Sequence, residues 1–110
     1  MWTHFKLKEF DSPDEPGSGA RMNHEFLDML DAARSIAGVP FRINSGYRSA
    51  KHNKKIGGVQ NSSHLRGLAA DISCTSSDQR FRILAALIAV GFTRIGIHRS
   101  FIHVDNDPVK

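Results

Sequence analysis

Apolar side chains recur with a helical period in the first half of the chain. Asn23 is a favourable N-cap, and Glu25 places a negative charge in the first turn that follows it. Gly38 ends the pattern, and Pro40 prevents a helix from continuing. The spacing predicts a helix over 24–37 whose buried side consists of Phe26, Leu27, Leu30, Ala33 and Ala37.

A second helical pattern lies in the second half of the chain. Ser77 or Asp78 can cap a helix from Gln79 to Val90, and Gly91 ends it. A shorter helix is expected over 49–56, before a pair of glycines. The residues predicted to form the buried side of the longer helix are Phe81, Leu84, Ala85, Leu87 and Ile88.

Five short segments have the composition or the alternation of β-strands, and the last two predict a terminal hairpin. Residues 11–19 contain two prolines and two glycines and predict a loop, as does most of 59–69. The mixture predicts an α+β fold, with a central antiparallel sheet flanked by helices in one domain over 1–110. The expected strands are Thr3–Phe10, Phe41–Asn44, Ala70–Ser73, Thr93–His98 and Phe101–Asp105.

Composition and charge narrow the classes of function. The 110 residues are 40% hydrophobic, which is enough for a small core. The formal net charge of +4 favours acidic partners such as cell-wall polymer, nucleic acid or a membrane surface, but the basic residues are spread as on an ordinary solvated surface. Cys74 is the only cysteine, so we expect a buried thiol and no intramolecular disulfide. No apolar run is long enough for a membrane span, and residues 1–10 lack the apolar segment of a secretory signal.

The terminal hairpin carries residues that suit metal chemistry. Because side chains alternate along a strand, Phe101, His103 and Asp105 share one face. Ile102 and Val104 lie on the other face, which we expect to be the core side. The strand therefore presents an imidazole and a carboxylate to a cleft.

The turn of the hairpin sets which residues face each other. If Arg99 and Ser100 form a two-residue turn, His98 pairs with Phe101 and Gly96 pairs with His103. His98 then lies diagonally from His103 on the same face, within reach of a shared site. Gly96 leaves room opposite His103.

Two more candidate ligands lie earlier in the chain. Asp71 faces away from Ala70 and Ile72 on its predicted strand, and Gly67 permits a reversal that brings His64 back beside it. Two imidazoles and one carboxylate, from His64, Asp71 and His103, suit a zinc ion that keeps one position for water. Spacing alone also allows ordinary surface or core roles for these three residues, because their spacing follows no general zinc rule.

A series of short motifs runs from residue 45 to residue 105. The segment 45–49 reads Ser-Gly-Tyr-Arg-Ser, and Asn53 and the Gly57-Gly58 pair follow it. The string SxHxxGxAxD spans 62–71, and HxD spans 103–105. Together these motifs resemble the M15 family of zinc peptidases, with a match that spans residues 5–105 and is closest to the small, phage-type branch. The resemblance implies an α+β fold shared with the hedgehog signalling domain and zinc ligands at His64, Asp71 and His103.

The resemblance also implies roles for residues around the metal. The arginine that matches Arg48 contacts substrate and stabilises charge near the scissile carbonyl, which a guanidinium can do. Ser62 matches a motif serine that binds substrate or a zinc ligand, although a loop-capping role is the alternative. Many members place an acidic general base three residues before the last zinc histidine, but this chain has Ser100 there. The base is therefore left between Asp105 and His98, and Asp105 can instead orient a zinc histidine.

The function that the resemblance implies is hydrolysis of a peptide bond in peptidoglycan stem peptides, of the D-Ala-D-Ala or L-Ala-D-Glu type, by a zinc-activated water. Whether the enzyme is an endopeptidase or a carboxypeptidase stays open. One alternative, which Ser100 favours, is a weakly active or inactive metal-binding recognition module. A nucleic-acid adaptor is a second alternative, but the chain lacks a series of stacking aromatics, so no nucleic-acid partner is expected. We expect a monomer that is made in the cytoplasm and reaches the bacterial wall by phage- or holin-type delivery.

Overall fold

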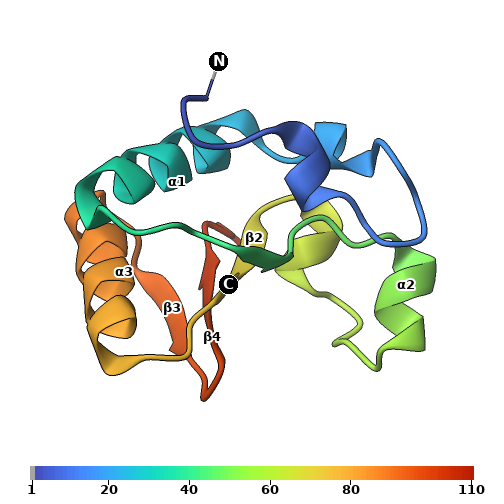
Figure 1. Cartoon of the computed structure of the whole chain (residues 1–110). Coiled ribbons are helices and arrows are strands. Elements are labelled where there is room, and N and C mark those ends of the chain that lie inside the picture. The colour runs from blue at the N-terminus through green and yellow to red at the C-terminus, as the bar shows by residue number, and fades with distance from the viewer. Residues whose placement is uncertain (1) are drawn as a thin grey trace.

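A computed structural model describes residues 2–110, which form three α-helices, three short 3-10 helices and a four-stranded antiparallel sheet (Figure 1). The α+β fold and the antiparallel sheet are therefore confirmed. The strand order is β1-β2-β4-β3. The helices are α1 (His24–Ala37), α2 (Ala50–Lys55) and α3 (Ser77–Ala89), with 3-10 helices η1 (Leu7–Phe10), η2 (Ser18–Arg21) and η3 (Ser63–Arg66). The strands are β1 (Ile43–Ser45), β2 (Ala69–Ser73), β3 (Arg94–Ile97) and β4 (Phe101–Asp105).

One face of the sheet forms the core with α1 and α3. Ile102 and Val104 of β4 and Ala70 and Ile72 of β2 are fully buried, as their alternation predicts. They belong to one apolar cluster with residues of both long helices. The opposite face of the same two strands is therefore left for polar side chains. In Figure 1, α2 and η3 lie on the far side of the sheet from α3.

Helix α1 follows the sequence prediction at both ends. The Asn23 side chain accepts a hydrogen bond from the Phe26 backbone N–H at 2.8 Å, so it caps the first turn. Gly38 ends the helix in the left-handed conformation, with φ of 68°. All five apolar residues predicted for the inner side are buried.

Helix α3 begins earlier than predicted, and its buried face is different. Ser76, rather than Ser77 or Asp78, accepts the capping hydrogen bond from the Gln79 N–H. The residues that are buried are Ile83, Ala86 and Leu87, whereas Phe81 is 71% exposed, Ile88 is 58% exposed and Ala85 is also exposed. The prediction is confirmed for Leu87 and for the partly buried Leu84, and it was wrong for Phe81, Ala85 and Ile88. Apolar residues occupy several sides of this helix, and the contact with α1 selects only one of them.

The N-terminal segment is not the predicted strand. Residues 7–10 form η1, and the Lys6 backbone N–H before it donates to the Glu9 carboxylate at 2.7 Å. The Thr3 and His4 backbone N–H groups donate to the Asp31 carboxylate, so a side chain takes the place of a neighbouring strand. This arrangement buries the rings of Phe5 and Phe10 against each other.

The other predicted elements are present with small shifts. Strand β1 covers 43–45 rather than 41–44, the short helix α2 covers 50–55, and η3 occupies part of the predicted 59–69 loop. The hairpin has the predicted register, because Gly96 pairs with His103 and the His98 N–H donates to the Phe101 carbonyl. Cys74 is buried and free, as expected. Among residues 2–110, no helix combines the length and the apolar character that crossing a bilayer requires.

Candidate metal centre

The polar face of the sheet places four positions in one row across its strands. Ser45 of β1 pairs with Asp71 of β2, Asp71 pairs with His103 of β4, and His103 pairs with Gly96 of β3. An irregularity in β1 between Ile43 and Ser45 makes this row possible, since one extra residue turns Ser45 onto the face of Asp71. The sheet thus brings β2 and β4 side chains together at its centre.

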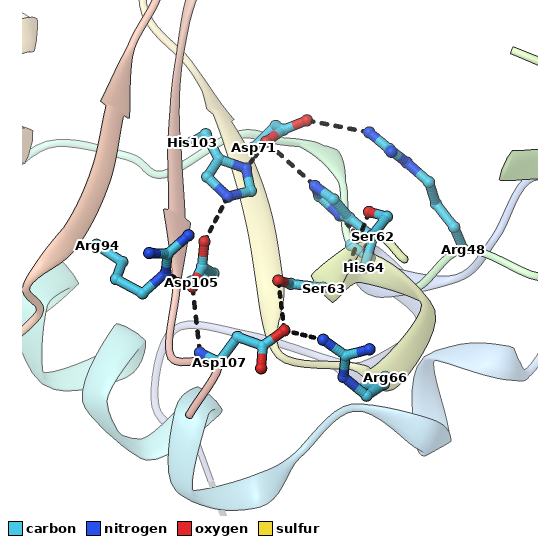
Figure 2. Close-up of polar contacts among 11 residues, drawn as sticks. Arg48, Ser62, Ser63, His64, Arg66, Asp71, Arg94, His103, Asp105 and Asp107 are labelled. Atoms are coloured by element: carbon cyan, nitrogen blue, oxygen red, sulfur yellow. Dashed lines mark hydrogen bonds and ion pairs between the residues drawn. The ribbon is translucent and has the colours of Figure 1, made fainter. Parts of the chain in front are cut away.

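The structure brings His64, Asp71 and His103 into one cluster (Figure 2). Asp71 Oδ1 is 3.3 Å from His64 Nε2 and 2.9 Å from His103 Nδ1. One candidate ligand atom from each residue lies within 4.8 Å of the others. His64 is carried by η3, and Gly67 reverses the chain after it with φ of 69°, as the sequence predicted.

Hydrogen bonds fix the orientation of the His64 ring. Its Nδ1 lies 2.7 Å from the Gly46 carbonyl oxygen, which can only accept, so Nδ1 donates to it and Nε2 is the nitrogen that faces the cluster and would bind a metal. A side chain at Gly46 would lie 2.7 Å from the Phe10 backbone, so this close approach requires glycine. The backbone N–H of Arg48 donates to the backbone carbonyl of His64, so the segment before α2 is bonded to η3.

His103 lies between two carboxylates. Its Nδ1 faces Asp71, and its Nε2 lies 2.8 Å from Asp105 Oδ2. Burial alone would lower the pKa of His103, but hydrogen bonds to both carboxylates raise the pKa above its ordinary value. Burial alone would raise the pKa of the Asp71 carboxyl, but hydrogen bonds from His103 and His64 hold it well below its usual range.

Asp105 is held from three sides. Its Oδ1 accepts from Arg94 Nε at 2.8 Å and from the Asp107 backbone N–H at 3.1 Å, while Oδ2 faces His103. Burial alone would raise the pKa of Asp105, but the His103 hydrogen bond, with those from Asp107 and Arg94, lowers it. Asp105 is 3% exposed and is ionised at neutral pH.

Arg48 reaches the cluster from the segment before α2. Its Nε donates to Ser45 Oγ at 3.1 Å, and its Nη1 donates to Asn53 Oδ1 at 3.2 Å. Its Nη2 lies 3.4 Å from Asp71 Oδ2. Burial lowers the pKa of Arg48, and the Asp71 charge opposes that effect. Gly58 is required beside this network, because a side chain there would overlap Asn53 Oδ1.

Two further residues predicted from the sequence, Ser62 and His98, are not among the three candidate ligands. Ser62 is buried and accepts from the His64 N–H as the N-cap of η3, which is the loop-capping alternative. His98 is exposed beside the turn of the hairpin and stacks on Phe101, with 4.2 Å between ring centroids. Ser100 lies in the turn, where its carbonyl accepts from the Cys74 N–H.

Sequence reasoning missed a second polar group beside the cluster. The Asp107 carboxylate accepts from Ser63 Oγ at 2.7 Å and pairs with Arg66, so it links the C-terminal segment to η3 (Figure 2). Burial alone would raise the pKa of Asp107, but these bonds and one from the Val109 N–H lower it to about 2. The only sequence signal was the position of Ser63 and Asp107 next to motif residues.

The donor set fits a divalent cation. Two imidazole nitrogens and one carboxylate oxygen are the ligands that catalytic zinc sites use with an open fourth position. Each histidine also has its second nitrogen bonded to an oxygen acceptor, as metal-binding histidines do. Without a cation, the same three atoms contact one another directly, because His64 Nε2 and His103 Nδ1 both face Asp71 Oδ1.

Comparison with known proteins agrees with this geometry. No curated protein matched the sequence significantly. A family model described as Peptidase M15 matches residues 3–105, which contain the whole cluster. The chain therefore belongs to the Peptidase M15 family of peptidases.

Proposed function

We propose that this peptidase is zinc-dependent and hydrolyses a peptide bond in peptidoglycan stem peptides, of the D-Ala-D-Ala or L-Ala-D-Glu type. The convergence of His64 Nε2, Asp71 Oδ1 and His103 Nδ1 carries the proposal. These atoms come from a 3-10 helix and two paired strands, so the scaffold holds them before any ligand arrives. A bound zinc ion would supply an electrophile for the carbonyl oxygen and lower the pKa of a bound water to about 7.

Arg48 is suited to stabilise the negative charge that develops on the carbonyl oxygen. Its guanidinium is held beside Asp71 by Ser45 and Asn53 and is 14% exposed. A fixed donor in a partly buried site needs little reorganisation when charge appears. Replacing Arg48 by Lys would keep the charge but lose the fork that Ser45 and Asn53 hold.

We assign Asp105 to positioning and His98 to proton transfer. Asp105 is hydrogen-bonded to His103 Nε2, Arg94 Nε and the Asp107 backbone N–H. Its oxygens therefore point away from Asp71 and His64. Among residues 2–110, the His98 imidazole makes no hydrogen bond; it lies on the same face, and its Nε2 lies 3.2 Å from where a side chain at Gly96 would begin. Histidine is the side chain that most often acts as a general acid or base in enzymes.

A second candidate function is a metal-binding module that recognises wall peptides without cleaving them. The observation that favours it is Ser100, which stands where many members of the family carry the acidic base. In that case zinc would raise the melting temperature of the chain, but no new amino groups would be released from peptidoglycan.

The test is mass analysis of purified peptidoglycan after incubation with the protein, with zinc and with a chelator. The proposal predicts new peptide termini at one type of alanine-containing bond, and their loss on chelation. Peptides that are identical under both conditions would refute the peptidase proposal and favour the recognition module. The net charge of +4 would assist docking on the anionic wall, where we propose that the protein acts as a monomer.

A further inference from the structure

A pocket of about 340 Å³ opens beside the cluster, on the side of His103 that faces away from Arg48. It lies over β3 and the end of β4, on the polar face of the sheet. The pocket therefore adjoins a candidate metal ligand without containing the cluster itself. It is lined by Thr93, Arg94, Ile95, Gly96, His103 and Asp105.

Gly96 keeps this pocket open. An added Cβ would lie 3.2 Å from His98 Nε2 and 3.5 Å from His103 Cβ, so any side chain would enter the space between the two imidazoles. Its φ is not positive, so backbone strain does not require glycine at this position. Glycine at position 96 therefore matters because it leaves the pocket between His98 and His103 unfilled.

Among residues 2–110, Arg94 is a side chain of the pocket that keeps hydrogen-bond donors without a protein acceptor. Asp105 has both oxygens occupied by Arg94, His103 and the Asp107 N–H, so it offers little to a ligand. Within residues 2–110, Asp105 is the only hydrogen-bond partner of the Arg94 guanidinium, and the bond uses Nε alone. The two terminal nitrogens of Arg94 are left to the pocket, and the side chain is 43% exposed.

We propose that Arg94 is a substrate-binding residue that holds a carboxylate of the peptide next to the scissile bond. Two free terminal nitrogens form the planar fork that binds a carboxylate with two hydrogen bonds. Arg48 is less suited to this role, since each of its three nitrogens already has a protein acceptor. The chain of contacts from Arg94 through Asp105 to His103 keeps this fork close to the cluster (Figure 2).

The inference rests on the proposed function for the identity of the carboxylate. In a D-Ala-D-Ala terminus, the residue that supplies the leaving nitrogen carries the terminal carboxylate. In an L-Ala-D-Glu stem that continues through the side-chain carboxyl, that residue keeps its α-carboxylate. Both bonds thus place a carboxylate one carbon from the leaving nitrogen, and Arg94 would serve either substrate.

Arg94→Gln separates the hydrogen bond from Nε to Asp105 from the proposed binding of a carboxylate by the two terminal nitrogens. Gln carries a nitrogen at the same position along the side chain as Arg Nε, so it can keep the bond to Asp105 while losing both terminal nitrogens. The matched control is Arg82→Gln, because Arg82 is an exposed arginine on α3 that pairs with Asp78 and lines no part of the pocket. The zinc content of both variants is measured.

The probes are two pairs that differ only in the carboxylate. They are N-acetyl-L-alanyl-D-glutamine and its α-amide, and N-acetyl-D-alanyl-D-alanine and its terminal amide. Binding is measured by NMR titration of the metal-stripped full chain, where turnover is not expected, and kcat/KM is measured on the zinc-loaded protein. We expect the unmodified protein to prefer at least one acid over its amide by about tenfold to a hundredfold.

In Arg94→Gln this preference should fall to about threefold or less, and Arg82→Gln should keep it in full. A preference that survives in Arg94→Gln, or that is missing from the unmodified protein for both pairs, overturns the assignment. Zinc-dependent turnover of acid and amide at equal rates would refute the carboxylate site and leave the peptidase proposal intact. A preference in binding without any turnover would refute the peptidase proposal and leave the carboxylate site intact.

Discussion

Replacing Asp107 by Asn tests whether the link between the C-terminal segment and η3 stabilises the fold. The Asp107 side chain is fully buried, accepts from Ser63 and pairs with Arg66, whose side chain is 34% exposed. The substitution keeps the volume but removes the charge. Hydrogen bonds to a charged group contribute about 1.5 to 3 kcal/mol each, and Arg66 can recover part of this from water, so we expect a loss of about 2 kcal/mol.

Because the pKa of Asp107 is lowered, the stability that this carboxylate contributes should decrease as the pH falls. A carboxyl whose pKa is about 2 in the folded chain contributes stability that is full above its ordinary pKa of about 4 and is lost as the pH falls towards 2. Linkage gives about 2 to 3 kcal/mol at neutral pH, in agreement with the hydrogen-bond figure, and about half of that at pH 3. The difference between Asp107→Asn and the unmodified protein should therefore shrink by about half between pH 6 and pH 3.

The assay is urea unfolding followed by circular dichroism across this pH range. At neutral pH, a loss of about 2 kcal/mol corresponds to a fall in melting temperature of about 8 °C for a chain of this length. Asp78→Asn is the control, because that carboxylate is 76% exposed and its pair with Arg82 should contribute less than about 0.5 kcal/mol. Equal stability of Asp107→Asn and the unmodified protein, or a loss that does not change down to pH 3, would show that the reasoning is wrong.

Three further predictions concern the cluster and its surroundings. In the metal-free chain, the raised pKa of His103 means that its stabilising contribution is full below about pH 6.5 and is lost as the pH rises through the raised value. Zinc must displace that proton, so zinc affinity should increase over the same range, and calorimetry that finds no proton release on zinc binding would contradict this. Asp105→Asn should weaken zinc binding by about 10- to 100-fold, whereas His98→Gln should keep zinc and slow hydrolysis by about 10²-fold or more; the reverse pattern would exchange the two assignments. Gly58→Ala should displace the Asn53 side chain from Arg48 and reduce kcat/KM at unchanged zinc content, and unaltered kinetics would argue against this positioning role.

The parts of the site that sequence reasoning placed correctly depend on local geometry. Strand alternation puts His103 and Asp105 opposite the buried Ile102 and Val104, and the two-residue turn fixes Gly96 against His103. These rules act over a few residues, so they hold without knowledge of the rest of the fold.

The parts that sequence reasoning missed depend on contacts between distant segments. The Ser63–Asp107 hydrogen bond joins residues 44 positions apart, and no local pattern encodes it. The inner face of α3 is chosen by α1 from several apolar sides, which is why Phe81 is exposed against expectation. In the N-terminal segment, the Asp31 carboxylate binds backbone groups that a strand would have paired.

The central claim is that one zinc ion held by His64, Asp71 and His103 is required for hydrolysis. The most direct measurement is the release of amino groups from purified peptidoglycan by the metal-stripped protein during titration with zinc. We predict a rise that ends at one zinc per chain and is missing in His103→Ala. Release that persists in the stripped protein, or that reaches the same level in His103→Ala, would contradict the claim.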